Sequence, residues 1–203
     1  MTLWIIAGIS KGQNIPQLRR NGGATQLIVD GKPFIMISGE LHNSSSSSLT
    51  YLDPLWSDLR KLNLNSIIAS ISWEQFEPVE GVYDFTLVDG IIQKAKENSL
   101  KVCLIWFATW KNGLSSYTPM WVKKDLRRFF RVQDKNGNNM DRISPTCKEA
   151  MVADAKAYAV LMKHIKEIDK ALSEISRVMK KEGKLIFTVP SNYFTSYLFF
   201  NFV

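Results

Sequence analysis

The chain has 203 residues, enough for about one domain whose core needs no disulfide or metal to hold it together. With 45% hydrophobic and 22% charged residues, its composition is that of a globular protein and excludes a disordered one. The net charge is +7, but the basic residues are spread out, and the densest run, Lys123 to Arg131, has helical spacing. We therefore expect a solvated helix face there and no nucleic-acid partner.

Metal, disulfide and membrane chemistry have little support in the sequence. The chain has two cysteines, Cys103 and Cys147, and two histidines, His42 and His164. Their spacing is not that of a zinc site or a disulfide framework, so we expect no metal and no cofactor. No apolar run reaches the roughly 18 residues of a membrane span, so we expect no membrane partner. Residues 1–14 are apolar in part but lack a basic start, which predicts a tail or a residual signal-like segment and leaves the compartment open.

The first part of the chain predicts a hairpin and then a strand–helix unit. "TQLIVDGKPF" has the pattern of two short strands around an Asp30-Gly31 turn. "FIMISGEL", residues 34–41, is nearly unbroken in its apolar character and ends in polar residues, as a fully buried parallel strand does. The serine run 44–48 predicts a flexible connector. Asp53 before Pro54 predicts an N-cap followed by the first residue of a helix.

Two further strand–helix units follow. "NSIIASIS" and "KVCLIWFATW" predict buried strands, and Cys103 in the second is expected in the core. "TLVDGIIQKAKENSL" and "CKEAMVADAKAYAVLMKHIKEID" have the period of amphipathic helices. Between them, "PMWVKKDLRRFF" predicts a short helix and "RVQDKNGNNMDRIS" a hairpin around Asn136-Gly137.

Three strand–helix units in a row, each of about 30 residues, predict an α/β protein with parallel strands. An open doubly wound sheet is the alternative, but no GxGxxG or Walker motif follows any predicted strand. We therefore expect an incomplete (β/α)8 TIM barrel, consisting of its first three to four βα units with an N-terminal β-hairpin. Polar residues gather at the C-terminal strand ends, on the face where such barrels build their sites.

The candidate residues that follow these strands each have a structural alternative. Glu40 favours a functional role, because a carboxylate at a buried strand end is costly without a partner or a task. His42 is either a ligand contact or a structural histidine, and Trp73 is either a sugar-stacking ring or a core ring. Glu77 either contacts substrate or orients a loop. The residues from Trp110 to Asn112 have the character of a polar rim.

Three stretches together resemble the N-terminal part of barrel glycoside hydrolases of the β-galactosidase type, families 35 and 42. They are "LIVDGKPFIMISGELH", "SWEQFEPVEGVYDFTLVDGIIQKAKENSLKVCLIW" and "FATWKNGLSSYTPMWV". The most specific element is W-x-x-x-E-P-x-x-G-x-Y-D-F, from Trp73 to Phe85. The resemblance covers residues 15–169, which we expect to form the barrel part.

In such enzymes the S-G-x-x-H motif, here Ser38 to His42, lies against the sugar-binding mouth, and the next residue, here Asn43, reaches the sugar. The resemblance puts Glu77 at the end of the second strand. Family 35 enzymes carry Ala-Glu-Trp at the end of the third strand, where Thr109 here replaces the glutamate and puts galactose itself in doubt. The implied substrate-binding set, with a carbohydrate as the partner, is Glu40, His42, Asn43, Trp73, Glu77, Thr109, Trp110 and Asn112.

The catalytic carboxylates of a retaining glycosidase are the next requirement. Two are needed, about 5–5.5 Å apart. In the resembled enzymes the acid/base belongs to an Asn-Glu pair after the fourth strand, and the nucleophile comes from a later strand. No Asn-Glu pair follows Asp169, and Glu182 is the last acidic residue. We therefore assign no catalytic residue.

The tail, residues 170–203, resembles a different family. "ALSEISRVMKKEGKLIFTVPSNYF" is similar to the late helix–turn–strand of class I S-adenosylmethionine-dependent methyltransferases. That segment does not hold the cofactor, and the cofactor-binding Gly-rich loop is absent. A junction near residues 169–171 would make the chain a chimera. In the alternative, residues 171–183 are another barrel helix and 184–189 the fourth strand, with Ser191 and Asn192 where the acid/base would stand.

Three hypotheses about function follow. The chain is an N-terminal fragment of a β-galactosidase-like hydrolase that is inactive alone, or a non-catalytic carbohydrate-binding or vestigial protein, or a misassembled reading frame. The parent family type is often secreted or periplasmic. A part of a barrel leaves strand edges unpaired, so we also expect self-association.

Overall fold

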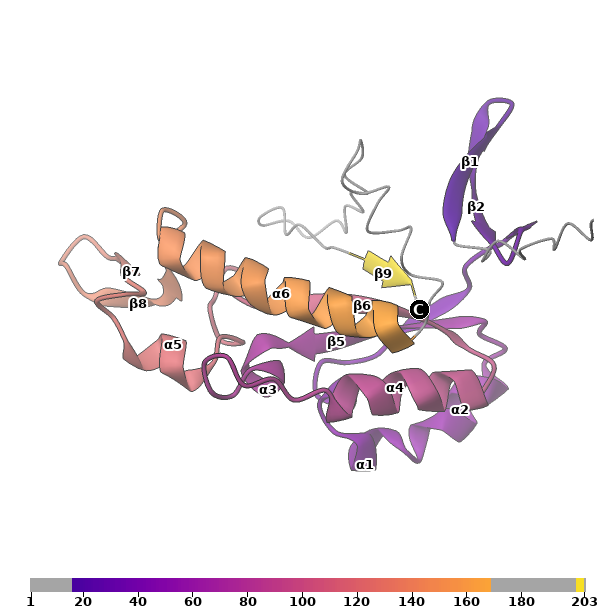
Figure 1. The fold of residues 1–203 in the computed structure, drawn as a ribbon, viewed down its shortest axis with the longest axis horizontal. Helices are drawn as coiled ribbons and strands as arrows, with labels where there is room; N and C mark the ends of the chain where they lie inside the picture. The colour runs from indigo at the N-terminus through magenta and orange to yellow at the C-terminus, as the bar shows by residue number, and fades with distance from the viewer. Residues whose placement is uncertain (1–15, 169–199, 203) are drawn as a thin grey trace, which may run out of the picture.

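The computed structural model describes residues 16–168 and 200–202, and its centre is a four-stranded sheet (Figure 1). Three of its strands run parallel: β4 (Ser38–Glu40), β5 (Ser66–Ser72) and β6 (Lys101–Phe107). The register places Glu40 beside Ile68 and Ser72 beside Phe107. The fourth strand, β9 (Phe200–Phe202), pairs with the free edge of β6 in the antiparallel sense. The parallel strands of the predicted α/β fold are confirmed.

Each parallel strand leads into helices, as the apolar periodicity predicts. After β4 come the 3₁₀ turn η1 (Ser45–Ser47), α1 (Leu49–Leu52) and α2 (Leu55–Lys61). After β5 come α3 (Trp73–Phe76) and α4 (Thr86–Glu97). After β6 come α5 (Met120–Lys124), the hairpin of β7 (Arg131–Gln133) and β8 (Asn139–Ile143), and the long helix α6 (Lys148–Ile168). This order of parallel strands and helices is consistent with part of a barrel.

The total number of βα units in the chain stays a prediction. The expected tail over 1–14 lies outside the described residues, as do residues 169–199. The alternative fourth strand at 184–189 and the whole methyltransferase-like segment, residues 171–194, fall in that second range.

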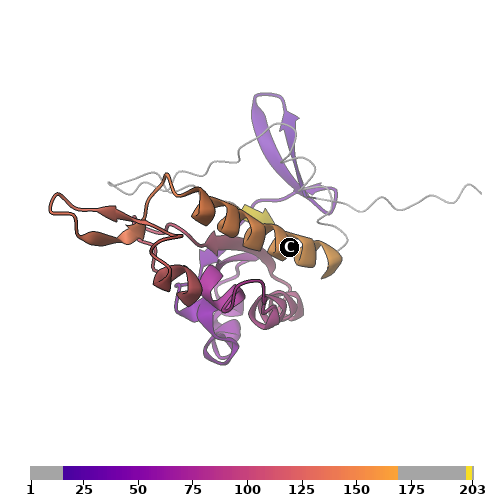
Figure 2. The same ribbon diagram turned by 60° about the vertical axis from the view of Figure 1, so that its left-hand side comes forward.

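An N-terminal antiparallel sheet stands apart from the main sheet, at the opposite end of the molecule from the β7–β8 hairpin (Figures 1 and 2). It consists of β1 (Gln17–Asn21), β2 (Ala24–Val29) and β3 (Lys32–Pro33). The predicted turn is confirmed: Asp30 and Gly31 both have positive φ, 51° and 77°, as a two-residue hairpin turn requires. β1 was not predicted, because all five of its residues are exposed and show no apolar alternation.

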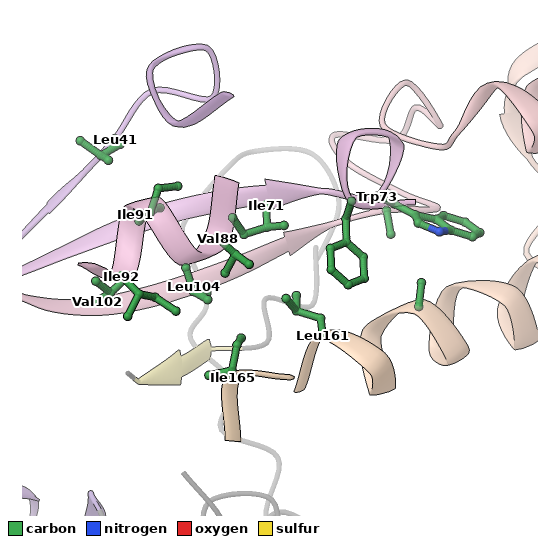
Figure 3. Packing of buried hydrophobic residues seen from close by; sticks show 14 of the residues in the cluster. Leu41, Ile71, Trp73, Val88, Ile91, Ile92, Val102, Leu104, Leu161 and Ile165 are labelled. Carbon is green, nitrogen blue, oxygen red and sulfur yellow. The ribbon is translucent and has the colours of Figure 1, made fainter. Parts of the chain in front are cut away.

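The main sheet has a helix-covered face and an inner face. Alternate residues of β5 and β6, such as Ile67, Ile71 and Leu104, join the core formed with α4 and α6. Figure 3 shows side chains of those two helices directed at these strands. The intervening residues point to the opposite side, which we call the inner face. On β5 and β6 these are Ser66, Ile68, Ser70, Ser72, Cys103, Ile105 and Phe107.

Cys103 is fully buried, as predicted for a core residue. Burial raises the pKa of its thiol to about 12, so the sulfur stays protonated and unreactive at neutral pH.

The predicted buried strand over residues 34–41 is wrong in extent and in burial. Only Ser38–Glu40 pairs, and Ile35 and Ile37 are 81% and 54% exposed. The physical reason is that β4 has a neighbour on one side only among the described strands, so its entry is uncovered.

The serine run is an ordered part of the fold and not a flexible connector. Ser46 is fully buried, and its Oγ lies 2.7 Å from Ser70 Oγ on the inner face. The expected helix start is also corrected: Asp53 ends α1, and Pro54 is the N-cap of α2. The side chain that caps a helix here is Ser48, which accepts a hydrogen bond from the Tyr51 amide.

None of the helices within residues 16–168 combines the length and the apolar character needed to cross a lipid bilayer.

Gly90 generates the first testable prediction. A Cβ at this position of α4 would lie 2.7 Å from Leu49 Cδ2 and 3.1 Å from Leu49 Cγ, closer than carbon atoms approach. Gly90→Ala should therefore lower the free energy of unfolding by about 1–2 kcal/mol, although alanine is the better helix former. Urea denaturation measures the change.

The matched control is the same substitution in a Leu49→Ala background, where the obstructing side chain is gone. There Gly90→Ala should be neutral or stabilising. Equal losses in both backgrounds would contradict the close approach of α1 and α4.

Candidate functional site

The candidate site lies at the C-terminal edge of the parallel strands. β4, β5 and β6 end at Glu40, Ser72 and Phe107, and parallel pairing brings these three ends to one edge. The segments that follow, residues 41–48, 73–85 and 108–119, form the surface above that edge. In barrel enzymes this is the face on which substrates bind.

A hydroxyl and amide network ties these segments to the inner face. Ser72 Oγ donates to Gln75 Oε1 at 3.0 Å, and Gln75 Nε2 donates to the Ser47 carbonyl at 2.8 Å. Together with the Ser46–Ser70 contact, these bonds fasten the loop after β4 to the end of β5. The loop is therefore held in one position relative to the sheet.

Four side chains meet where the first and third units face each other. Asn43 Nδ2 donates to Tyr117 Oη at 2.7 Å, and the Tyr117 ring lies 5.1 Å from the Phe107 ring, centroid to centroid. Lys111 Nζ lies 4.2 Å from the centroid of the Phe107 ring. We call Asn43, Phe107, Lys111 and Tyr117 the mouth cluster. An amide, a phenol and an ammonium group on an aromatic base are the groups with which proteins bind polar, hydroxylated ligands.

Glu77 lies beside this edge as a buried carboxylate that is 3% exposed. Its Oε2 accepts from Trp73 Nε1 and its Oε1 from the Gly81 amide, both at 2.7 Å. Its main-chain carbonyl accepts from Trp121 Nε1 at 3.0 Å. Because both carboxylate oxygens are used within the protein, these contacts favour the loop-orienting interpretation of Glu77.

Trp73 itself is fully buried and meets Trp121 edge to face, with ring centroids 5.6 Å apart. This burial favours the core interpretation of Trp73 over sugar stacking, which needs an exposed ring face.

Tyr83, in the same motif, lies close enough to the Glu77 carboxylate to be affected by it. Burial, and after it the nearby Glu77 carboxylate, raises the pKa of the Tyr83 phenol above its ordinary value.

Two of the residues predicted at the end of β4, Glu40 and His42, are solvent-exposed. Glu40 is exposed, so the expectation of a buried carboxylate there is wrong, because nothing described covers that side of β4. His42 is exposed too, and its Nδ1 lies 2.8 Å from Ser44 Oγ. Of the residues after β4, the structure brings only Asn43 to the mouth cluster.

The predicted residues after β6 divide between two faces. Thr109 turns to the helix side, where its amide and hydroxyl both donate to Asp154 Oδ2 of α6. Trp110 is 42% exposed at the rim. Asn112, with φ of 54°, forms a tight turn with Gly113.

Tyr117 and Asp154 were not predicted from the sequence, and Lys111 was predicted only as part of the polar rim and not as a substrate-binding residue. Asp154 also accepts from Trp106 Nε1 at 2.7 Å, so it fixes the end of β6 against α6. A polar residue on the buried side of an amphipathic helix was the available signal for Asp154.

Paired charges surround the edge. Glu74 and Lys123 form an ion pair at 2.9 Å, and Glu80 and Arg128 form a two-bond pair at 2.7 and 2.8 Å. The Arg128 hydrogen bonds lower the pKa of the Glu80 carboxyl.

A cavity of about 350 Å³ opens between Trp121 and α6, and Glu77 and Glu80 line it. Within residues 16–168 and 200–202, no three His, Cys, Asp or Glu side chains gather as metal ligands would.

Residues 54–175, more than half of the chain, match the family Glyco_hydro_42, described as beta-galactosidase. The chain belongs to the Glyco_hydro_42 family. The matched range contains β5, β6 and the helices that follow them, and it runs past residues 169–171. No curated protein matches the chain significantly.

Two solved structures have a partly similar fold. One is the exo-β-1,4-mannosidase Op5Man5 from Opitutaceae bacterium strain TAV5, with 20% identity, a TM-score of 0.49, and coverage of 70% of this chain and 24% of the mannosidase. The other is the catalytic domain of the beta-amylase from Paenibacillus polymyxa, with 17% identity and a TM-score of 0.49. That match covers 66% of this chain and 34% of the beta-amylase. The chain therefore spans about a quarter and about a third of these two chains.

The Glu77 contacts generate the second prediction. Glu77→Gln leaves one side-chain oxygen to serve two donors and turns an NH₂ group toward one of them. We expect a loss of about 2–3 kcal/mol in the free energy of unfolding, because a buried donor is left without a partner. Urea denaturation monitored by tryptophan fluorescence measures it.

Glu80→Gln is the matched control, since it makes the same chemical change three residues later at an exposed ion pair. It should cost less than about 1 kcal/mol. A Glu77→Gln variant as stable as Glu80→Gln would show that the buried carboxylate does not hold the loop.

Proposed function

We propose that this Glyco_hydro_42 chain is a carbohydrate-binding part of a β-galactosidase-like barrel, inactive alone as a hydrolase. The observation that carries the proposal is the mouth cluster at the C-terminal edge of the strands, where Asn43 and Tyr117 offer groups for sugar hydroxyls. The family membership supports a carbohydrate as the ligand. Glu40, His42, Trp110 and Asn112 would form the outer rim of the same site.

The carboxylates beside the site support the proposed inactivity. Glu77 uses both oxygens within the protein, and Glu74 is paired with Lys123. Retaining hydrolysis needs two carboxyl groups about 5–5.5 Å apart, one of them free to donate a proton. In the sequence after Asp169 no Asn-Glu pair supplies the acid/base.

A non-catalytic carbohydrate-binding or vestigial protein is the second candidate. Thr109 favours it: the residue that stands in place of the expected galactose-binding glutamate donates to Asp154 on the helix side, away from the mouth. In this proposal the tail 170–203 is a methyltransferase-like addition without cofactor binding, which makes the chain a chimera. Long-read sequencing of the locus across codons 160–180 tests it, and a continuation into an Asn-Glu strand in another frame would contradict it.

Self-association is a further part of the proposal. Among the described strands β4 has an unpaired edge, and the residues leading into it include the exposed Ile35 and Ile37. Unpaired edges beside apolar side chains pair with other chains. A single sharp monomer peak on a sizing column, with cooperative melting, would contradict this expectation.

The third prediction concerns catalysis. The purified chain should show no turnover of an aryl β-galactoside above the background rate, because the acid/base is absent. Measurable turnover that copurifies with the chain would contradict the proposed inactivity.

The fourth prediction concerns binding. Sugar should change the fluorescence of the tryptophans in a saturable way at millimolar concentration. Tyr117→Phe should weaken that binding by about three- to tenfold, because it removes the hydroxyl and leaves Asn43 Nδ2 without its acceptor. Tyr51→Phe makes the same change at a ring that is 58% exposed on α1 and should have no effect. Equal effects of the two variants, or no sugar response, would count against the mouth cluster.

A further inference from the structure

Lys111 carries an uncompensated positive charge at the mouth of the site. Its Nζ lies over the Phe107 ring, and Phe107 is the last residue of β6 on the inner face. The backbone of Lys111 is held by two hydrogen bonds with Leu114, at 2.9 and 3.0 Å, which close the Asn112-Gly113 turn. The ammonium group is therefore presented from a fixed turn beside the mouth.

No carboxylate among the described residues neutralises this charge. The ion pairs within residues 16–168 involve other basic side chains, and the neighbouring Lys123 is paired with Glu74. The Phe107 ring attracts the ammonium group but carries no net charge that could balance it. An anion at the mouth would thus gain a charge-assisted partner that the protein itself leaves open.

The other three residues of the mouth cluster are neutral. Asn43 uses its amide nitrogen on Tyr117, which leaves Asn43 Oδ1 as an acceptor and the Tyr117 hydroxyl as a donor. Thr109 stands where the resemblance expects a glutamate. Glu40 ends β4, and β5 lies between β4 and β6, the strand that leads to Lys111.

We propose that Lys111 makes the site selective for acidic sugars, with the ammonium group binding the C6 carboxylate of a uronic acid while Asn43 and Tyr117 bind ring hydroxyls. The inference rests on the proposed carbohydrate-binding function and specifies its substrate class.

The test compares two ligands that differ only at C6, methyl β-D-galactopyranoside and methyl β-D-galactopyranosiduronate. Dissociation constants are measured on the full chain by ligand-observed NMR and tryptophan fluorescence at constant ionic strength. The uronate should bind about tenfold more tightly at low salt, as expected for one charge-assisted hydrogen bond. That advantage should shrink toward onefold in 0.5 M NaCl, where charges are strongly screened.

Three variants identify the residue. Lys111→Met keeps the apolar stem on Phe107 but should abolish the tenfold advantage, and Lys111→Arg should retain most of it. Lys96→Met is the matched control, because it removes the same charge from an exposed site on α4. It should leave both dissociation constants unchanged.

The outcomes separate this inference from the function on which it rests. Equal binding of the two sugars would overturn the role of Lys111 while the sugar site stands. Binding of neither sugar would overturn the proposed function and the inference together. An equal loss in Lys96→Met would assign the preference to the net charge of +7 and overturn the inference. Should Lys111→Met fail to fold by circular dichroism, the salt dependence and Lys111→Arg decide the question.

Discussion

The buried carboxylate of Glu77 is the interaction on which the arrangement of the site depends. One oxygen accepts from the Trp73 indole at the end of β5, and the other accepts from Gly81 in the loop that leads to α4. The Glu77 carbonyl accepts from the Trp121 indole of α5. A single residue thereby joins the second strand–helix unit to the helix that follows the third strand. Burial of this carboxyl group is compensated by the hydrogen bonds that both of its oxygens accept.

The mouth cluster is connected to the segment that these Glu77 hydrogen bonds hold. The Glu74 amide donates to the Tyr117 carbonyl at 3.0 Å, so the segment that carries Tyr117 is attached to the turn that Glu77 stabilises. Asp154 performs a related task from the other side, holding Trp106 and Thr109 against α6. Phe107, the residue after Trp106 in β6, points to the opposite, inner face of the sheet. The position of the mouth cluster thus depends on Glu77 and Asp154, whose carboxylates make their contacts within the protein.

Local sequence patterns were sufficient to predict most of the longer elements but not the short ones or the contacts between them. The Asp30-Gly31 turn, the strands around Ile67 and Leu104 and the long helix after Cys147 follow from turn chemistry and apolar period, which act over a few residues. β1 escaped prediction because its side chains all face solvent. The burial expected for Glu40 and the residues before it failed, since burial of a strand depends on neighbours that local pattern does not reveal.

The site residues show the same division. Glu77 was found because it belongs to a compact motif, whereas Asn43 and Tyr117 meet across 74 positions and Thr109 and Asp154 across 45. Contacts of that range are fixed by the docking of whole units, and a single sequence carries no local trace of them. The resemblance supplied Asn43 but gave no indication of Lys111, whose position follows from a tight turn and a ring four residues earlier.

The direction of β9 has a kinetic consequence for any assembly at that edge. β9 pairs antiparallel with three residues of β6, whereas β5 pairs with seven. A barrel grows at this edge only by parallel addition, so an incoming strand of that kind competes with β9 for the same main-chain donors and acceptors. Strand exchange would begin where β6 extends beyond the short β9 pairing and proceed by stepwise replacement. β9 therefore occupies part of the main-chain edge of β6 that a further parallel strand would need.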